Sequence, residues 1–265
     1  MLYAKEGDRN PRVVALQILL NRHKPRGIVL AVDGVYGTKT SGGITAYRET
    51  AMAASGPGDT ADSTLWQHLL RPAKLHVVDA VDISDPAVIE HVVPVLSEWG
   101  TPIEMGPMSN GVVQVMVEIR ARAKGKKQSL VLVRFHGHGA PGLLAISFGK
   151  RSLFPGVHAP NERTVLNADT IGVLRSALAI DPYLADFGFI EMHACKVARG
   201  SVGIRMLKDL AEIWKAPVTA GLTSQSMGGK ANYVLTAPSY TAFPGDVDLK
   251  KWASTRKEAL NLVPT

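Results

Sequence analysis

The residues best suited to chemistry are three histidines and the chain's single cysteine, which gather in two short segments. His136 and His138 lie at the end of an apolar run that begins SLVLVRF, and His193 and Cys195 follow the run FGFIEM. Such runs are typical of strands inside a covered sheet, and sites in parallel sheets collect where the strands end. If the two strands are parallel neighbours, an imidazole and a thiol meet at one edge. This pair suits nucleophilic catalysis, because a nearby base raises the fraction of thiolate.

The residues next to this pair fit the same chemistry. Gly139 directly follows His138 and lets a backbone N–H approach a substrate oxygen closely, as an oxyanion-stabilising donor must. Cys195 lies just before a predicted helix, whose N-terminus favours a negatively charged sulfur.

Two other interpretations of the same residues stay open. His136, His138, His193 and Cys195 are all of zinc-ligand type and could form a metal site. No carboxylate pattern such as HExxH accompanies them, so we expect a site without metal or cofactor. Alternatively, Cys195 is simply a small buried apolar side chain. A further alternative is a protein without catalytic activity that binds the cell wall or another protein and keeps only a relict pocket.

Three carboxylates near predicted strand ends are candidate neighbours of the site, namely Asp79, Asp82 and Glu191. Together they could form an acidic pocket for a basic substrate side chain. The alternative is that each is an ordinary surface carboxylate.

The elements that must position these residues alternate from residue 74 onward. Runs rich in β-branched and apolar residues predict strands at residues 75–83, 129–135, 187–192, 217–220 and 231–236. Apolar stripes predict helices at residues 86–99, 110–123, 168–179 and 202–214. This alternation predicts an α/β fold with a mostly parallel sheet covered by helices.

A smaller helical module precedes the alternating region. Residues 11–24 and 40–47 have helical apolar spacing, a glycine-containing turn lies between them, and a third helix at 64–70 ends before Pro72. We therefore divide the chain into a module at residues 1–72 and an α/β domain at residues 73–265. Since about 190 residues suffice for one core, we expect the second domain to fold alone.

Three motifs of the first module occur in the order VxxLQxxLN, VDGVYGxxT and TLWQHL. This order resembles the peptidoglycan-binding domain of bacterial cell-wall enzymes. The resemblance implies a three-helix fold that binds cell-wall glycopeptide through the turn containing Asp33, Gly34, Tyr36 and Gly37. Docking of another protein, or regulation of the second domain, is the open alternative.

The blocks FHGHG and HACKVARG resemble the histidine and cysteine blocks of caspase-like peptidases, among them metacaspases, separases, gingipains and the related CHAT peptidases. The resemblance implies a caspase-like fold and a bacterial cysteine endopeptidase. It implies that Cys195 is the nucleophile, that His138 is the general acid and base, and that the backbone N–H groups of Gly139 and Cys195 form the oxyanion hole. His136 is the alternative base.

Two features limit what this resemblance implies. Metacaspases carry an aspartate two residues before the cysteine, where this chain has His193, so a preference for Arg or Lys does not carry over. Residues 149–167 resemble the position at which caspase relatives are cut during activation. The alternative is that they form an ordinary exposed loop.

Composition excludes several classes. The net charge of +7 is spread along the chain without a recognisable nucleic-acid module. One cysteine excludes an internal disulfide, and no apolar run predicts a membrane span. The two resemblances imply a protein or peptide substrate, and peptidoglycan or a docking protein as a further partner. No secretory signal is seen, so the bacterial cytoplasm and export to the envelope by a non-classical route both stay open.

Overall fold

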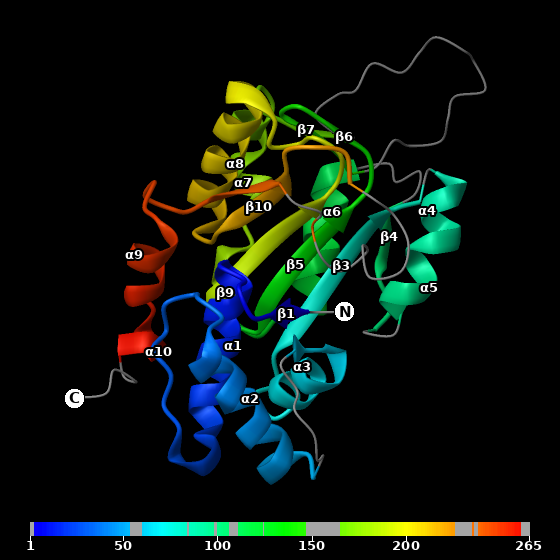
Figure 1. The fold of residues 1–265 in the computed structure, drawn as a ribbon. Helices are drawn as coiled ribbons and strands as arrows, with labels where there is room; N and C mark the ends of the chain where they lie inside the picture. The colour runs from blue at the N-terminus through cyan, green and yellow to red at the C-terminus, as the bar shows by residue number, and fades with distance from the viewer. Residues whose placement is uncertain are drawn as a thin grey trace, which may run out of the picture.

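The computed structural model describes residues 3–53, 60–83, 85–97, 100–105, 111–123, 125–146, 165–225, 235 and 238–260, with the backbone alone at 173, 174, 259 and 260. The fold is α/β, with a mixed and mostly parallel sheet of six strands at its centre (Figure 1). The strands are β3 (His76–Asp82), β4 (Ile103–Met105), β5 (Leu130–His136), β9 (Leu184–His193), β10 (Val218–Gly221) and β11 (Ser239–Ala242). Their order across the sheet is β11-β10-β9-β5-β3-β4, and only β11 runs antiparallel to its neighbour. The predicted fold class is thus confirmed at this level.

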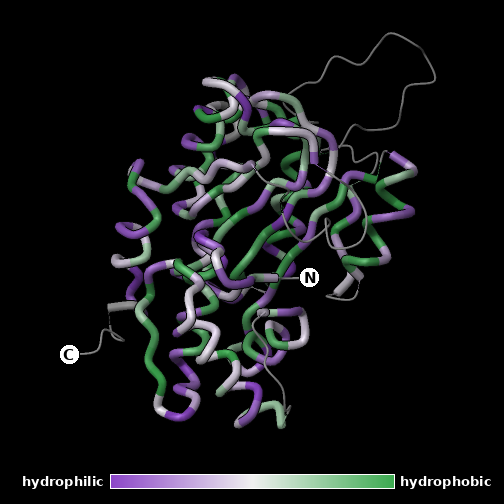
Figure 2. The backbone as a smooth tube through the Cα atoms, in the orientation of Figure 1, coloured by the Kyte–Doolittle hydropathy of each residue, from purple (hydrophilic) through white to green (hydrophobic). Residues whose placement is uncertain are grey.

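One face of the sheet is covered by three helices, α6 (Gly111–Arg122), α7 (Ile171–Leu178) and α8 (Gly200–Trp214). The apolar stripe of α8 buries Leu207, Leu210 and Trp214. The Trp214 indole stacks on Phe135 of β5, with ring centroids 6.0 Å apart. These contacts follow from the helical spacing of large apolar side chains. In Figure 2 the central strands are largely hydrophobic, while the helices around them alternate between hydrophobic and hydrophilic residues.

The opposite face is covered by the N-terminal segment. It contains β1 (Ala4–Lys5), α1 (Pro11–His23), a 3-10 turn at Pro25–Gly27, α2 (Thr38–Ala51), β2 (Thr60–Ala61) and α3 (Ser63–Leu70). The side chain of Asn10 caps α1 by accepting from the Val13 N–H at 3.1 Å. Helix α1 is buried continuously from its first residue to Asn21, because it lies between the sheet and the rest of the segment.

The N-terminal segment and the sheet share one hydrophobic core. Leu132 of β5 and both Phe187 and Phe189 of β9 belong to the same cluster as the apolar side chains of α1, and Trp252 of α9 (Leu249–Ser254) joins it. A short last helix, α10 (Lys257–Leu260), follows α9. This shared core speaks against independent folding of residues 73–265, although the division into two domains itself stays a prediction. The predicted boundary between residues 72 and 73 lies in a turn that joins the end of α3 to the start of β3.

Two local predictions differ from the structure, and a third lies mostly outside the described residues. The helix expected at 86–99 is two short helices, α4 (Pro86–His91) and α5 (Val93–Leu96), because Pro94 has no N–H to continue the first one. The loop expected after His138 contains β6 (Gly139–Ala140) and β7 (Leu143–Ala145), which pair with each other, and β7 also pairs with β8 (Val165–Asn167) to form a small second sheet. The last strand of the main sheet is β11, whereas most of residues 231–236 lie outside the described residues.

Residues 149–164 of the expected activation segment also lie outside the described residues. None of the helices in the described part of the chain combines the length and the apolar character needed to cross a bilayer.

Candidate functional site

The two chemistry-bearing segments meet at one edge of the sheet. Strands β5 and β9 are parallel neighbours, and their register places His136 opposite His193. His138 and Cys195 each follow two residues later, in the segments that leave the ends of these strands. This register agrees with the expectation that the two segments meet at one edge of a parallel sheet.

A close contact at Gly139 joins the two segments. A Cβ atom at this position would lie 2.8 Å from the carbonyl oxygen of Cys195 and 2.9 Å from the Cβ of Ala194. Real Cβ atoms do not approach other atoms so closely, so only glycine fits here. The residue after His138 therefore packs directly on the turn that holds the thiol.

The turn around Cys195 is held by backbone hydrogen bonds from both sides. The N–H of Gly142, in the segment after β5, donates to the Val197 carbonyl at 3.0 Å. On the other side, the N–H of Lys196 donates to the Thr223 carbonyl at 2.9 Å. Lys196 adopts a left-handed conformation, with φ of 60°, to make this turn. The cysteine thus sits on a fixed turn between the ends of β5 and β10.

The sulfur of Cys195 is half-buried and receives a hydrogen bond. The backbone N–H of Gln225, four residues after β10, lies 3.4 Å from Sγ. Sγ in turn lies 3.9 Å from the carbonyl oxygen of Gln225, so both backbone groups of this residue hold the sulfur in place. Sequence reasoning missed Gln225, since a backbone donor leaves no mark on residue type.

His138 is exposed and has a carboxylate partner. Its side chain is 54% exposed, and its Nε2 lies 3.0 Å from Oδ2 of Asp85. Asp85 is itself fixed, because its Oδ1 accepts from the Ala87 N–H and caps α4. An ionised carboxylate only accepts, so Nε2 carries the proton and Nδ1 is left for proton exchange. Sequence reasoning missed Asp85, although an Asp before Pro86 directly after the first sheet strand is a helix-cap signal.

Behind this edge, β3 and β5 bury a group of three charged and polar side chains, which we name the sheet triad: Arg134, Asp79 and His136. Arg134 donates from Nε and Nη2 to the two oxygens of Asp79, at 2.6 and 2.9 Å. The Nε2 of His136 lies 3.1 Å from Oδ1 of the same carboxylate. All three side chains are at most 4% exposed.

A second group of the same composition lies beside it, which we name the bridging triad: Arg12, Glu191 and His193. Arg12 of α1 donates to both oxygens of Glu191, at 2.5 and 2.7 Å, across 179 residues of sequence. The Nε2 of His193 lies 3.0 Å from Oε2 of Glu191. The imidazoles of His193 and His136 are in contact, with ring centroids 4.7 Å apart.

Burial and ion pairing shift the pKa values of both triads. Burial alone raises the pKa of Glu191, but the charge of Arg12 and the hydrogen bond from His193 outweigh it and lower the pKa to about 2. Burial likewise raises the pKa of Asp79, and Arg134 and His136 lower it well below its ordinary value. Burial lowers the pKa of His193 to about 4 despite its bond to Glu191.

Burial also lowers the pKa of His136, and the bond to Asp79 offsets this only in part. Both imidazoles are therefore neutral at pH 7 and donate from Nε2.

These contacts decide between several interpretations of the sequence. Asp79, Asp82 and Glu191 are all buried, so none is an ordinary surface carboxylate. Asp79 and Glu191 are neutralised by arginines, which leaves them poorly suited to bind a basic substrate group. Asp82 lies beside Gly137, whose Cβ would come 3.0 Å from the Cβ of Asp82.

The zinc interpretation gains no support from the geometry. In the part of the chain that the structure describes, no group of three or more His, Cys, Asp or Glu side chains is arranged to hold a metal ion. His136 and His193 are each bonded through Nε2 to a different carboxylate, whereas His138 is bonded to Asp85.

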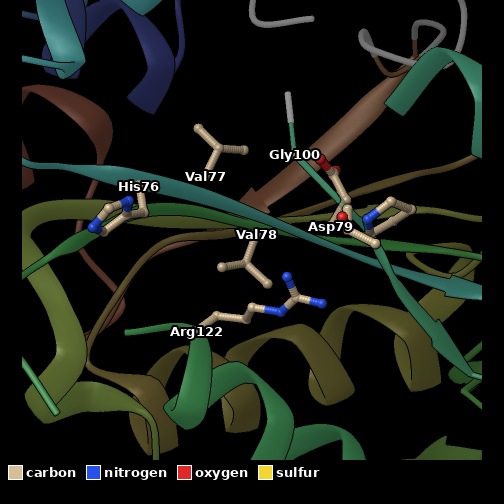
Figure 3. A pocket seen from close by; sticks show the side chains of 8 residues that line it. His76, Val77, Val78, Asp79, Gly100 and Arg122 are labelled. Carbon is tan, nitrogen blue, oxygen red and sulfur yellow. The ribbon is translucent and has the colours of Figure 1, made fainter. Parts of the chain in front are cut away.

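A cavity of about 180 Å³ lies beside the first half of β3 (Figure 3). It is lined by residues 76–79 of the strand, by residues 100–102 and by Arg122 of α6. Val77 and Val78 point to opposite sides of the strand there. Strand β4 pairs only with residues 80–82 of β3, so the cavity occupies the edge that β4 leaves uncovered. Asp79 of the sheet triad reaches this cavity.

The turn expected to bind peptidoglycan is tied into the fold. The side-chain oxygen of Gln17 accepts from the N–H groups of Asp33 and Gly34, at 3.1 and 3.0 Å. Tyr36 is 1% exposed, and a Cβ at Gly34 would lie 2.9 Å from a methyl group of Leu249 in α9. These residues therefore stabilise the packing of the turn against α1 and α9.

A cavity of about 330 Å³ opens beside the same turn and is lined in part by Asp33, Gly37 and Lys39. Wall binding stays a prediction.

Compared with protein-family models, with curated proteins and with solved structures, the chain matches none of them.

Proposed function

We propose that the protein is a caspase-like cysteine endopeptidase in which Cys195 is the nucleophile and His138 is the general acid and base. The observation that carries this proposal is the close contact of Gly139 with the Cys195 turn, which brings the segment of the imidazole onto the segment of the thiol. The parallel sheet with both segments at its carboxyl edge supports the same assignment, because sites of such folds lie there.

The proposed reaction begins with the thiolate of Cys195 attacking the carbonyl carbon of a peptide bond. His138 holds the thiol proton and donates it to the leaving amine as the C–N bond breaks. A water molecule then attacks the thioester, His138 takes one proton from it, and the thiol is regenerated as the acid product leaves. The Nε2–H bond to Asp85 keeps the imidazole in the tautomer whose Nδ1 can exchange these protons.

Backbone donors complete the proposed site. The N–H groups of Gly139 and Cys195 are the proposed oxyanion hole, since both belong to segments that touch at the strand ends. Donors of this kind need no reorganisation when charge develops on the substrate oxygen. We propose no cofactor for this reaction.

His138 is favoured over His136 as the base by its surroundings. His136 is buried, neutral and bonded to Asp79 behind the sheet edge, whereas His138 is exposed to solvent. A general base must reach the reacting atoms, so the exposed imidazole suits the role.

A peptide library tests the proposal. The wild-type protein should cleave a subset of the library, and Cys195→Ala should cleave none. His138→Ala should lower kcat by about 100-fold or more, the usual size of a general acid–base contribution. His91→Ala, which removes another exposed histidine on α4, is the matched control and should leave the rate unchanged. Cleavage that survives in Cys195→Ala, or that chelators abolish, would remove the thiol mechanism.

A further inference from the structure

We infer that Arg12 is a positioning residue for the Cys195 thiol, which it holds in place through Glu191 and His193. The N-terminal helix is then a working part of the catalytic centre and not only a targeting module. This inference rests on the proposed function where it concerns turnover, but the position of the thiol can be measured without any substrate.

The first step of the argument is how firmly Arg12 is held. Its guanidinium makes two hydrogen bonds to Glu191 and a third, at 2.6 Å, to the carbonyl of Tyr3. The Arg12 and Glu191 side chains are only 6% and 7% exposed. Both bonds to Glu191 come from one nitrogen, Nη2, and such charge-assisted hydrogen bonds are roughly twice as strong as neutral ones. The pair therefore fastens α1 to one point on β9.

The second step is where that point lies. Glu191 is bonded to His193, the last residue of β9, and Cys195 comes two residues later. The turn beyond is tight, because a Cβ at Gly139 would be 2.8 Å from the Cys195 carbonyl oxygen. A shift at the end of β9 therefore moves the thiol against both Gly139 and the N–H of Gln225.

The third step is the charge on His193. Groups that face it are Glu191 on its own strand, His136 and Arg134 from β5, and Arg12 from α1 through Glu191. With Arg12 in place, the charge of Glu191 is compensated and His193 stays neutral. Without the guanidinium, the nearest cation that can compensate Glu191 is a protonated His193. Loss of Arg12 should thus draw a proton onto the residue that ends the cysteine strand.

A matched control lies on the same helix. Arg22 also reaches from α1 to the C-terminal part of the chain, where it pairs with Glu258. That pair is about one-third exposed. The Arg22 guanidinium also lies over the ring of Phe187, 5.2 Å from its centroid, six residues before the end of β9. Arg22→Met removes an inter-segment ion pair of α1 without touching the route from Arg12 to Cys195.

The experiment compares Arg12→Met with Arg22→Met in the full chain. Three quantities are measured: the pKa of His193 by histidine NMR, assigned with His193→Gln; the rate at which iodoacetamide alkylates Cys195; and kcat and KM for a cleaved peptide. The single cysteine makes the alkylation signal unambiguous.

In Arg12→Met we expect the pKa of His193 to rise by about one unit or more. Alkylation should slow, because the displaced sulfur loses the Gln225 N–H. We expect kcat to fall by roughly 10- to 100-fold with KM nearly unchanged, as for a misplaced reacting group. Arg22→Met should match the wild type in all three quantities.

The double variant Arg12→Met/Glu191→Gln separates positioning from folding. It removes the uncompensated buried charge, and replacing both partners of a buried pair is often well tolerated. A folded double variant with slow alkylation and low kcat supports the inference. Wild-type alkylation and kcat in either folded variant contradict it, and so does failure of both variants to fold, which would make Arg12 a folding residue only. If the wild-type protein cleaves no peptide, the proposed function fails, while the NMR and alkylation results still decide the inference.

Discussion

The sheet triad and the bridging triad contain the same chemistry in two different structural settings. Each joins an arginine, a carboxylate and a neutral imidazole, and the two imidazoles are in contact. The sheet triad is complete within β3 and β5, so the sheet alone can form it. The bridging triad takes its arginine from α1. The difference indicates that the N-terminal segment matters for the cysteine strand in a way it does not for the histidine strand.

The largest effect on stability is expected when the N-terminal segment is removed. Residues 73–265 expose Phe187 and Phe189 and leave Glu191 without its guanidinium, while the sheet triad is untouched. Each large apolar side chain contributes about 1.5–3 kcal/mol when buried, against a typical total stability of about 5–15 kcal/mol.

We therefore expect the fragment to be insoluble or unfolded by circular dichroism and size-exclusion chromatography. Co-expression with residues 1–72 should restore a soluble complex. A soluble fragment that melts cooperatively would show that the sheet needs no cover from α1.

A second test breaks the sheet triad instead. Arg134→Met leaves the buried carboxylate of Asp79 uncompensated, and breaking such a pair costs about 3–5 kcal/mol. Arg205→Met is the control, because Arg205 and its partner Asp169 are 61% and 91% exposed. Denaturant melts of both variants give the two free energies of unfolding. An equal effect of the two substitutions would mean that the sheet triad contributes nothing to stability.

A third test uses pH, to which both triads respond in the same direction. The pKa of His193 is lowered from 6.5 to about 4, so the unfolded chain binds the extra proton and stability falls as pH drops from 6.5 to 4. The pKa of Glu191 is lowered from 4.5 to about 2, so further stability is lost as pH falls through that window.

Each buried histidine contributes a slope of about 1.4 kcal/mol per pH unit at most. His193→Gln should flatten the dependence of unfolding free energy on pH between 4 and 6.5. A slope identical to that of the wild type would contradict the neutral, buried state of His193.

The smallest effect on stability is expected at Asp85, outside both triads. Asp85→Asn keeps an oxygen to cap α4, so the melting temperature should change little. Asp85→Ala removes the cap and should cost about 1 kcal/mol. Both should lower kcat, because neither provides the carboxylate that holds the Nε2–H of His138. A kcat equal to that of the wild type in both variants would remove Asp85 from the site.

The parts of the fold predicted well from sequence are those with strong local patterns. Strands β5 and β9 and helices α1 and α8 were all expected within a few residues of where they lie, because their apolar runs and stripes are long. Strand β4 has only three residues and carries no such pattern. Hairpin β6–β7 was missed because its pairing depends on the tertiary structure and not on its glycine-rich sequence.

In the candidate site, too, features set by local sequence patterns could be predicted and features set by tertiary packing could not. The approach of the His138 and Cys195 segments could be predicted, because parallel neighbouring strands bring their ends together. Arg134 was hidden inside an apolar run, and nothing near Arg12 indicates a partner 179 residues away. Such long-range ion pairs depend on how helices and sheet pack, which local residue patterns do not encode.

Covalent capture of the nucleophile tests the proposed dyad most directly. The full-length protein is incubated with a panel of peptides that carry a thiol-reactive electrophile at the scissile position, and intact-mass spectrometry measures the rate of adduct formation. We predict one adduct, at Cys195, that forms quickly with a subset of peptides. Its formation should lose this selectivity in protein denatured beforehand, and should slow strongly in His138→Ala but not in His91→Ala. Equal adduct rates with all peptides and in His138→Ala would contradict the assignment of Cys195 and His138 as a catalytic pair.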